Sequence, residues 1–179
     1  MSKKVVPYTR FLPETLAVLD RPGLLLVSQG EDGVPNAMTI GWGTVGIMWA
    51  KEVFTIMVRP SRYTFSRLQQ SDSFTVNVPG PDLHSAVAFC GSHSGRDYDK
   101  FVECGMTPEP SEMVRGPGIA ECPIVYECKI VHTTDVISAN LDPEIVAHSY
   151  SRGDLHRIYH GEIQAVRAAE GAREALGLG

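Results

Sequence analysis

Stretches of β-branched and aromatic residues, bounded by Gly, Pro or Asp-Gly, recur along the whole 179-residue chain. Such stretches are typical of β-strands. They predict six strands, at 24–29, 35–47, 53–59, 73–78, 124–136 and 155–165. Helical patterns are short and fall at 61–70, 82–89, 94–104 and 167–178. Because these helices are too few and too unevenly spaced for a repeating strand–helix–strand sheet, we expect a mainly β fold, an antiparallel barrel with helices inserted at its corners.

Two features refine this pattern. Gly41, Gly43 and Gly46 interrupt the second strand, and glycine inside a strand often marks a bulge or a close approach to the backbone. Ser61, Asp82 and Ser94 stand where helix N-caps are expected, because their side chains can accept from free backbone N–H groups.

The charge balance excludes one large class of function. The chain has 16 Lys and Arg against 21 Asp and Glu, a formal charge of −5. A general nucleic-acid binder needs a basic surface for phosphate contacts, so we expect no nucleic-acid partner. Hydrophobic residues make up 43% of the chain, which is enough for a real core.

The sequence predicts a single cytoplasmic domain over residues 1–179. Lys3 and Lys4 are not followed by an apolar stretch of the secretory type, and no apolar run approaches the roughly 20 residues that span a bilayer. We therefore expect no membrane partner. No repeat or linker suggests a second domain.

The cysteines and histidines do not form metal-binding patterns. The four cysteines at 90, 104, 122 and 128 contain no C-x-x-C, and we expect them to be reduced thiols. The histidines have neither H-x-x-x-H nor H-E-x-x-H spacing, so no metal site is expected.

The segment from Arg59 to Thr64, with the sequence RPSRYT, carries the clearest chemistry. It joins a strand to a helix, whose first turn offers unpaired N–H groups and partial positive charge. Arg59 and Arg62 add planar guanidinium groups, and Ser61 and Thr64 add hydroxyls. Together they predict a phosphate site, although a capped surface helix with ordinary arginines is an alternative of similar weight.

Two further segments are weaker signals. The sequence CGSHSGRD at 90–97 is a Gly- and Ser-rich loop that could bring backbone amides to a ligand, or form a plain capped turn. The sequence NAMTIGWG at 36–43 places small and polar residues in a strand, along which a flat ligand could lie. Its alternative is a bulged barrel strand with Trp42 in the core.

These segments resemble one known family when taken together. They are PNAMT with Trp42, RPSRYT at 59–64, SFTVNVP at 73–79, and CG with SGRD and Lys100-Phe101 at 90–101. In this order they are similar to the flavin reductase-like family, and within it to the flavoredoxin-type branch, over about residues 14–166. The resemblance implies an FMN-binding split β-barrel that forms a homodimer with the flavin near the subunit interface.

The resemblance also implies roles for individual residues. The strand near residues 36–42 would line the flavin ring, the segment at 59–64 would hold the phosphate, and the loop at 90–100 would face the flavin. The residues implied to bind the cofactor are Asn36, Met38, Thr39, Trp42, Arg59, Ser61, Arg62, Tyr63, Thr64, Cys90, Gly91, Ser94, Gly95 and Lys100. Gly153-Asp154-Leu155-His156 resembles the family's Gly-Asp-His motif with one residue inserted, which would put His156 near the nicotinamide or flavin.

Three functions are compatible with these residues. The first is an FMN-dependent oxidoreductase that uses NAD(P)H or a redox partner, in which the flavin does the chemistry and no side chain is assigned as catalytic. The second is an electron-carrier flavoprotein with little NAD(P)H turnover. The third is a barrel that binds another anionic ligand. The chain has no Gly-x-Gly-x-x-Gly with an acidic ribose ligand, so a pyridine nucleotide would bind without that fingerprint.

Overall fold

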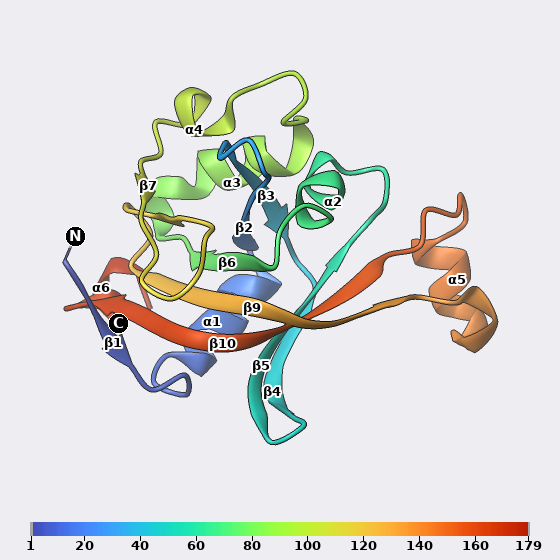
Figure 1. Ribbon diagram of the computed structural model, residues 1–179, viewed down its shortest axis with the longest axis horizontal. Helices are drawn as coiled ribbons and strands as arrows, with labels where there is room; N and C mark the ends of the chain where they lie inside the picture. The colour runs from blue at the N-terminus through green and yellow to red at the C-terminus, as the bar shows by residue number, and fades with distance from the viewer. Residues whose placement is uncertain (1, 179) are drawn as a thin grey trace.

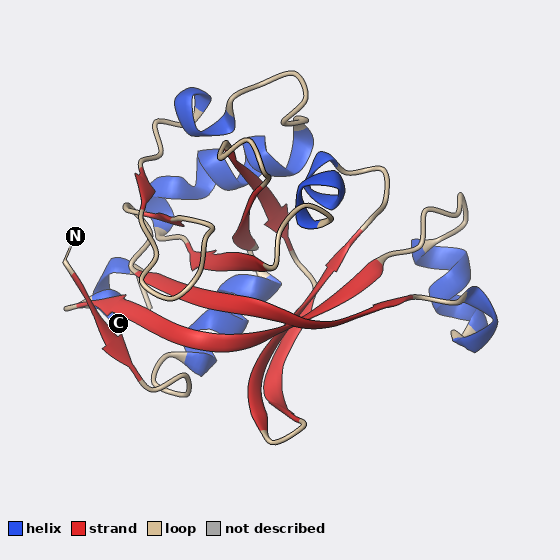
Figure 2. Cartoon of the chain, viewed as in Figure 1, coloured by secondary structure: helices blue, strands red, loops and turns tan. Residues whose placement is uncertain are grey.

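A computed structural model describes residues 2–178 and shows a twisted antiparallel sheet with helices around it (Figures 1 and 2). Seven strands follow the order β3-β2-β6-β9-β10-β5-β4, and β1 pairs with β10. Their bounds are β1 Lys3–Val6, β2 Leu24–Gln29, β3 Pro35–Ile40, β4 Gly43–Met48, β5 Lys51–Val58, β6 Ser73–Val78, β9 Ile124–Asp135 and β10 Arg157–Ala169. All pairs in this sheet are antiparallel. The mainly β, antiparallel architecture expected from the sequence is confirmed.

Short helices and a small second sheet surround the strands. The α-helices are α1 Leu12–Asp20, α2 Tyr63–Leu68, α3 His84–Ser92, α4 Lys100–Glu103, α5 Pro143–Ser149 and α6 Ala172–Ala175. Two 3-10 turns, η1 Pro81–Leu83 and η2 Ser138–Asn140, and the strand pair β7 Pro108–Glu109 and β8 Gly118–Ile119 complete the described chain. In Figure 1, α2, α3 and α4 lie above β6 and β9, and α1 passes behind β9 and β10.

The apolar run of β2 is buried on both of its faces. Leu24 and Leu26 point into the main core with Phe54, Phe74 and Tyr126. Leu25 and Val27 point the other way, into a second core formed with α3, α4 and the β8 segment. A strand that is covered on both faces needs no polar alternation, which explains why four apolar residues stand in a row.

Strand β5 instead alternates between the core and the outside. Phe54, Ile56 and Val58 are fully buried, whereas Thr55 and Met57 are partly exposed on the opposite face. Because side chains alternate along a strand, Arg59 continues the outward row just past the end of β5. This outward face leads to the candidate site.

Several expected boundaries are wrong. The stretch 35–47 is two strands, because the chain leaves β3 at Gly41-Trp42 and restarts in β4. The last long strand starts at Arg157 and extends to Ala169, so the final helix shrinks to four residues. The expectations also omitted β1, α1, α5 and the β7–β8 pair.

The three expected helix caps are wrong, because the helices begin elsewhere and Ser61 has another partner. Ser61 bonds Asp154 instead of capping α2, which begins two residues later, at Tyr63. Asp82 lies in η1, and α3 starts after it. The helix expected at 94–104 is reduced to Lys100–Glu103, because Asp99 provides the cap by accepting from the N–H groups of Phe101 and Val102.

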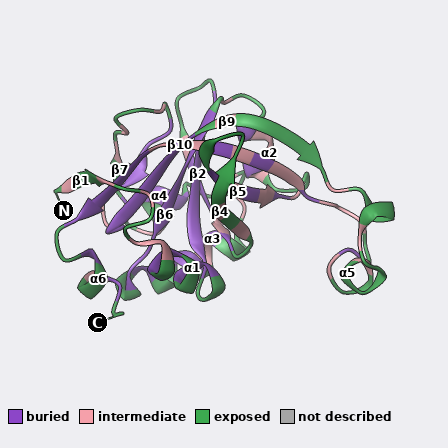
Figure 3. Cartoon of the chain, turned by 90° about the horizontal axis from the view of Figure 1, so that it is seen from below, coloured by how far each residue is buried: buried purple, intermediate pink, exposed green. Residues whose placement is uncertain are grey.

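The segment that connects β9 to β10 projects from the rest of the molecule (Figures 1 and 3). It contains η2 and α5, and α5 buries none of its residues. Ile137 and Ile145 are 58% and 47% exposed there. The far end of this segment, residues 149–156, returns to the sheet beside the candidate site.

Candidate functional site

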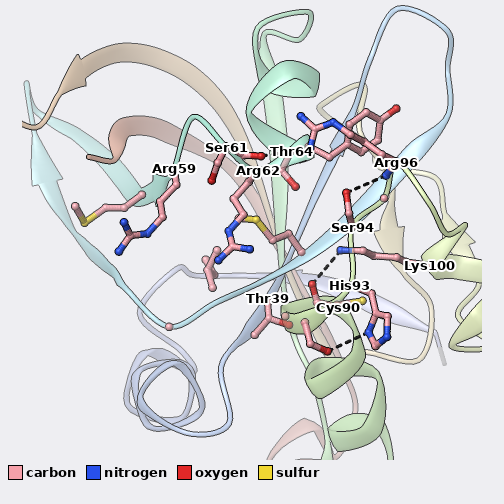
Figure 4. A pocket seen from close by; sticks show the side chains of 18 of the residues that line it. Thr39, Arg59, Ser61, Arg62, Thr64, Cys90, His93, Ser94, Arg96 and Lys100 are labelled. Atoms are coloured by element: carbon pink, nitrogen blue, oxygen red, sulfur yellow. Dashed lines mark hydrogen bonds between the residues drawn. The ribbon is translucent and has the colours of Figure 1, made fainter. Parts of the chain in front are cut away.

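A cavity of about 350 Å³ opens on the outer face of the sheet, where β3, β5, α2 and α3 meet (Figure 4). This volume is within the range of small-molecule pockets. The lining residues are Met38, Thr39, Ile40, Gly41, Trp42, Met57, Arg59, Ser61, Arg62, Tyr63, Thr64, Cys90, Gly91, Ser92, His93, Ser94, Gly95, Arg96, Lys100 and His156.

The cavity brings together nearly all of the residues that the sequence analysis predicted to bind a cofactor. Asn36 is the exception: it lies behind the wall, where its Nδ2 donates to Thr64 Oγ1 over 2.9 Å. The expected set omitted Ile40, Gly41, Met57, Ser92, His93 and Arg96. Arg96 could have been included from its charge and its place in the SGRD sequence, whereas Met57 is found only from the outward row of β5.

The β3 wall is fixed to α3 from behind. Thr39 Oγ1 donates to the Val87 carbonyl over 2.6 Å. A Cβ at Gly91 would lie 3.4 Å from Thr39 Cβ, so the end of α3 packs closely on this strand. Beyond the end of β3 the wall is exposed to solvent, and Trp42 there is 46% exposed.

Arg59 and Ser61 have partners within the protein. Arg59 donates to the carbonyls of Ser149 and Asp154 over 2.8 and 3.0 Å. Ser61 gives both its N–H and its hydroxyl to the Asp154 carboxylate, over 3.1 and 2.6 Å. These four bonds fasten the 149–156 segment to the end of β5. Arg59 and Ser61 therefore hold this wall of the cavity in place.

Arg62 and Arg96 approach the cavity from two different loops (Figure 4). Arg96 lies 5.4 Å above the Tyr63 ring and donates to the Ser61 carbonyl over 3.3 Å, which ties its loop to the start of α2. The hydroxyls of Thr64 and Ser94 belong to the same side of the cavity. Guanidinium groups with nearby hydroxyls are the donors that recognise phosphate.

Lys100 adds a buried cation to this site. Its side chain reaches the C-terminal end of α3, where Nζ donates to the Cys90 carbonyl over 2.9 Å, and the residue is only 5% exposed. Burial lowers the pKa of Lys100, and the nearby charge of Arg62 lowers it further. An anion in the cavity would offset both effects.

All the charged side chains of the lining are cationic. They are Arg59, Arg62, Arg96 and Lys100, and no Asp or Glu is among the described lining residues. The chain as a whole has a formal charge of −5. The cavity is therefore a positive site in an acidic protein, suited to an anionic ligand.

Gly95 gives the loop its close approach to the wall. A Cβ at this position would overlap Asn36 Oδ1 and lie 2.8 Å from Tyr63 Cδ1. The absence of a side chain therefore lets the loop that carries Ser94 and Arg96 pack against the α2 segment.

The loop at 90–97 differs from the expected form in one respect. Residues 90–92 form the end of α3 instead of a loop that enters a helix. This end carries partial negative charge, which the Lys100 ammonium compensates. Cys90 is 1% exposed, and burial raises the pKa of its thiol to about 12. It is a small packing residue at physiological pH.

His156 lines the cavity beside Trp42 and Tyr150. Its Nδ1 is 2.8 Å from the Tyr150 hydroxyl, and its ring centroid is 5.1 Å from that of Trp42. Burial, with the charge of Arg59, lowers the pKa of His156 to about 4. The imidazole is thus neutral near pH 7, and it adds no charge to the site.

Other site types are not found in the described part of the chain. No group of three or more His, Cys, Asp or Glu side chains could hold a metal ion among residues 2–178. The four cysteines are free. No helix of the described chain is long and apolar enough to cross a membrane.

A comparison with known protein families shows which family this chain belongs to. The model of the flavin reductase like domain matches residues 19–178. The chain belongs to the flavin reductase-like family. The family and split-barrel fold suggested by the sequence segments are thus confirmed, and the chain is a flavin-related redox protein.

Solved structures agree with this family assignment. Flavoredoxin from Methanosarcina acetivorans is 25% identical, with a TM-score of 0.65 over 83% of this chain and 69% of that one. An FMN-binding domain of a flavin reductases-like enzyme from Shewanella baltica is 20% identical, with a TM-score of 0.64 over 93% and 77%. The second likeness shows the split-barrel fold.

A curated relative of this flavin reductase-like chain is an uncharacterized protein of Archaeoglobus fulgidus. It is 29% identical over 138 residues, which cover 77% of this chain and 71% of that protein. Four further relatives are also uncharacterized proteins, and each match covers 34–62% of the relative's own length.

Proposed function

We propose that the cavity binds FMN and that the protein is an FMN-dependent oxidoreductase. The observation that carries this proposal is the all-cationic lining of a pocket in an acidic member of the flavin reductase-like family. The FMN-binding domain from Shewanella baltica, which has the same fold, supports the choice of FMN.

The residues present fit the parts of FMN. Arg62 and Arg96, with the hydroxyls of Thr64 and Ser94, would hold the phosphate dianion. The β3 segment around Thr39 and the Gly91 turn of α3 pack closely and both line the cavity, so the flat ring would lie against them. When bound, FMN supplies the redox chemistry, since it accepts a hydride or electrons at N5.

The remaining residues would tune the environment of the ring. Lys100 contributes a buried positive charge, which favours an anionic reduced flavin over the neutral form. His156 offers a neutral imidazole held by Tyr150, and Trp42 lies beside it. Arg59 and Ser61 would act mainly by holding the 149–156 segment that carries His156.

The electron donor separates two versions of this function. We propose NAD(P)H as the donor of the oxidoreductase. An electron carrier that exchanges electrons with a redox protein is the second candidate, favoured by the similarity to flavoredoxin from Methanosarcina acetivorans. Anaerobic mixing distinguishes them: fast bleaching of the flavin by NADH or NADPH supports the reductase, and bleaching only through a protein partner supports the carrier.

We also propose a homodimer with the flavin site near its interface. The exposed apolar side chains Ile47 and Trp49 of the β4–β5 hairpin, and Ile145 of α5, support this proposal. Light scattering coupled to size exclusion should give twice the 19.6 kDa mass of the chain.

Titration of the purified apo protein with FMN tests the central proposal. Saturable quenching of FMN fluorescence, with one FMN per chain, is expected. No FMN affinity would refute it. A different result would favour a barrel that binds another anionic ligand: the wild type binds phosphate or sulfate but no flavin, and Arg62→Ala loses that anion binding.

A further inference from the structure

Two histidines lie side by side on the outer face of the sheet, outside the cavity. His132 on β9 and His160 on β10 are directly opposed in the strand register. Their ring centroids are 5.3 Å apart, and the planes are tilted by 31°. Directly opposed residues of an antiparallel pair point to the same face with their Cβ atoms close together.

A third strand fixes the orientation of one ring. Thr55 on β5 is the register partner of His160 on its other side, and the Thr55 hydroxyl is 3.0 Å from His160 Nδ1. This contact occupies Nδ1 and leaves Nε2 as the free nitrogen. A hydrogen bond to the second nitrogen is the usual arrangement for a histidine that binds a metal.

The hairpin between β4 and β5 covers the pair. Trp49, at its tip, has its ring centroid 5.5 Å from that of His132 and 5.8 Å from that of His160. Trp49 and Ala50 both adopt left-handed backbone conformations, with φ of 52° and 57°. Such conformations are unfavourable for residues other than Gly, Asn and Asp, so the turn directs a large aromatic ring to this place at a cost.

The spacing of the rings agrees with chelation of one ion. With a metal–nitrogen bond of about 2.0–2.1 Å, tetrahedral to square geometry puts two imidazole centroids about 4.5–5.2 Å apart around a shared ion. The observed 5.3 Å needs little further movement, and His132 is exposed. Neutral imidazole is a preferred donor for Zn²⁺, Ni²⁺ and Cu²⁺.

We propose that His132 and His160 form a two-histidine site for a borderline divalent transition-metal ion such as Zn²⁺ or Ni²⁺. Water completes the coordination, Thr55 orients His160, and the bound ion joins β9 to β10 beside the register shift at His160/Gly161. This site is separate from the cavity, since His160 lies four residues beyond His156, roughly 13 Å of extended backbone.

The test titrates the full-length protein with NiCl₂, ZnCl₂ and MgCl₂ by calorimetry. One Ni²⁺ or Zn²⁺ per chain is expected to bind, and Mg²⁺ is expected to bind at least 100-fold more weakly because it prefers oxygen ligands. His132→Ala and His160→Ala should each weaken Ni²⁺ binding at least tenfold, since each leaves a single imidazole. His148→Ala, on α5, is the matched control and should leave the affinity unchanged.

Fluorescence locates the ion independently. Ni²⁺ should quench tryptophan emission in the wild type, and Trp49→Phe should remove this quenching while calorimetric binding remains. Ni²⁺ affinity that survives both histidine variants would overturn the proposal, as would quenching that persists in Trp49→Phe. Circular dichroism of each variant confirms that the fold is retained. None of these results depends on whether FMN binds.

Discussion

Gly95 offers a direct test of how closely the cavity is built. In Gly95→Ala the new Cβ would overlap Asn36 Oδ1 and lie 2.8 Å from Tyr63 Cδ1, so it must move by 0.6 Å to reach an ordinary 3.4 Å contact with Tyr63 alone. Either the loop with Ser94 and Arg96 shifts outward, or Asn36 turns and loses its bond to Thr64.

The expected cost follows from overpacking. Inserting a methyl group into a closely packed site costs about 1–3 kcal/mol. If the whole cost reduces the binding free energy of FMN, the affinity falls roughly 5- to 160-fold. The free energy of unfolding of the apo protein should fall by only about 0.5–1.5 kcal/mol, the value of one hydrogen bond.

The assay is FMN titration by fluorescence quenching, with urea unfolding of the apo protein beside it. Gly46→Ala is the matched control: it also adds one methyl group to a glycine outside the left-handed region, but no described atom lies within 4 Å of that position. Its FMN affinity should stay within twofold of the wild type. If Gly95→Ala bound FMN as tightly as Gly46→Ala, the close packing of this loop would not matter to the site.

Three other changes have defined outcomes. Arg62→Ala should weaken FMN binding by about 1.5–3 kcal/mol, the value of a charged hydrogen bond, and an unchanged dissociation constant would remove Arg62 from the site. His156 has a pKa of about 4 in the folded state against an ordinary 6.5, so the unfolded chain binds the proton first. Stability is therefore complete above pH 6.5 and falls as the pH drops toward 4, by about 2 kcal/mol at pH 5. Urea unfolding of apo wild type and His156→Gln should show this loss only in the wild type. Gly161→Ala puts a Cβ 2.5 Å from Phe74 Cζ and should destabilise the core by about 1–3 kcal/mol in the same assay.

Each of these has its own check. Arg115→Ala, at a surface arginine outside the cavity lining, should leave the FMN affinity unchanged. Equal pH dependence of wild type and His156→Gln would contradict the lowered pKa. A Gly161→Ala variant as stable as Gly46→Ala would show that Phe74 has more freedom than its packing indicates.

Local pattern was enough to predict the strands that pack against the core. β6 matches its expected range because it is apolar, β-branched and bounded by Pro79 and by the polar run before Ser73. The cap expected at Ser61 failed because its partner is distant in sequence: Ser61 bonds Asp154, 93 residues later. No local rule weighs a partner that only the tertiary fold brings close.

The candidate site shows the same division. The segments at 36–42, 59–64 and 90–100 were found because each contains its own unusual residues. The 149–156 segment was expected to contribute only His156, through the Gly153–His156 motif. Tyr150, which holds His156, has no local pattern, and the bond from Ser61 to Asp154 depends on the tertiary fold. Met57 was missed because its role depends on which face of β5 turns outward.

The alternation of β5 also bears on how this protein can diverge. Phe54, Ile56 and Val58 lie in the core, whereas Met57 and Arg59 line the cavity and Thr55 contacts His160 on the outer face. Selection for stability and selection for a new ligand therefore act on different residues of one strand. A descendant could therefore change the lining of its cavity by substitutions at every second position of β5, and the core side chains between them would stay the same.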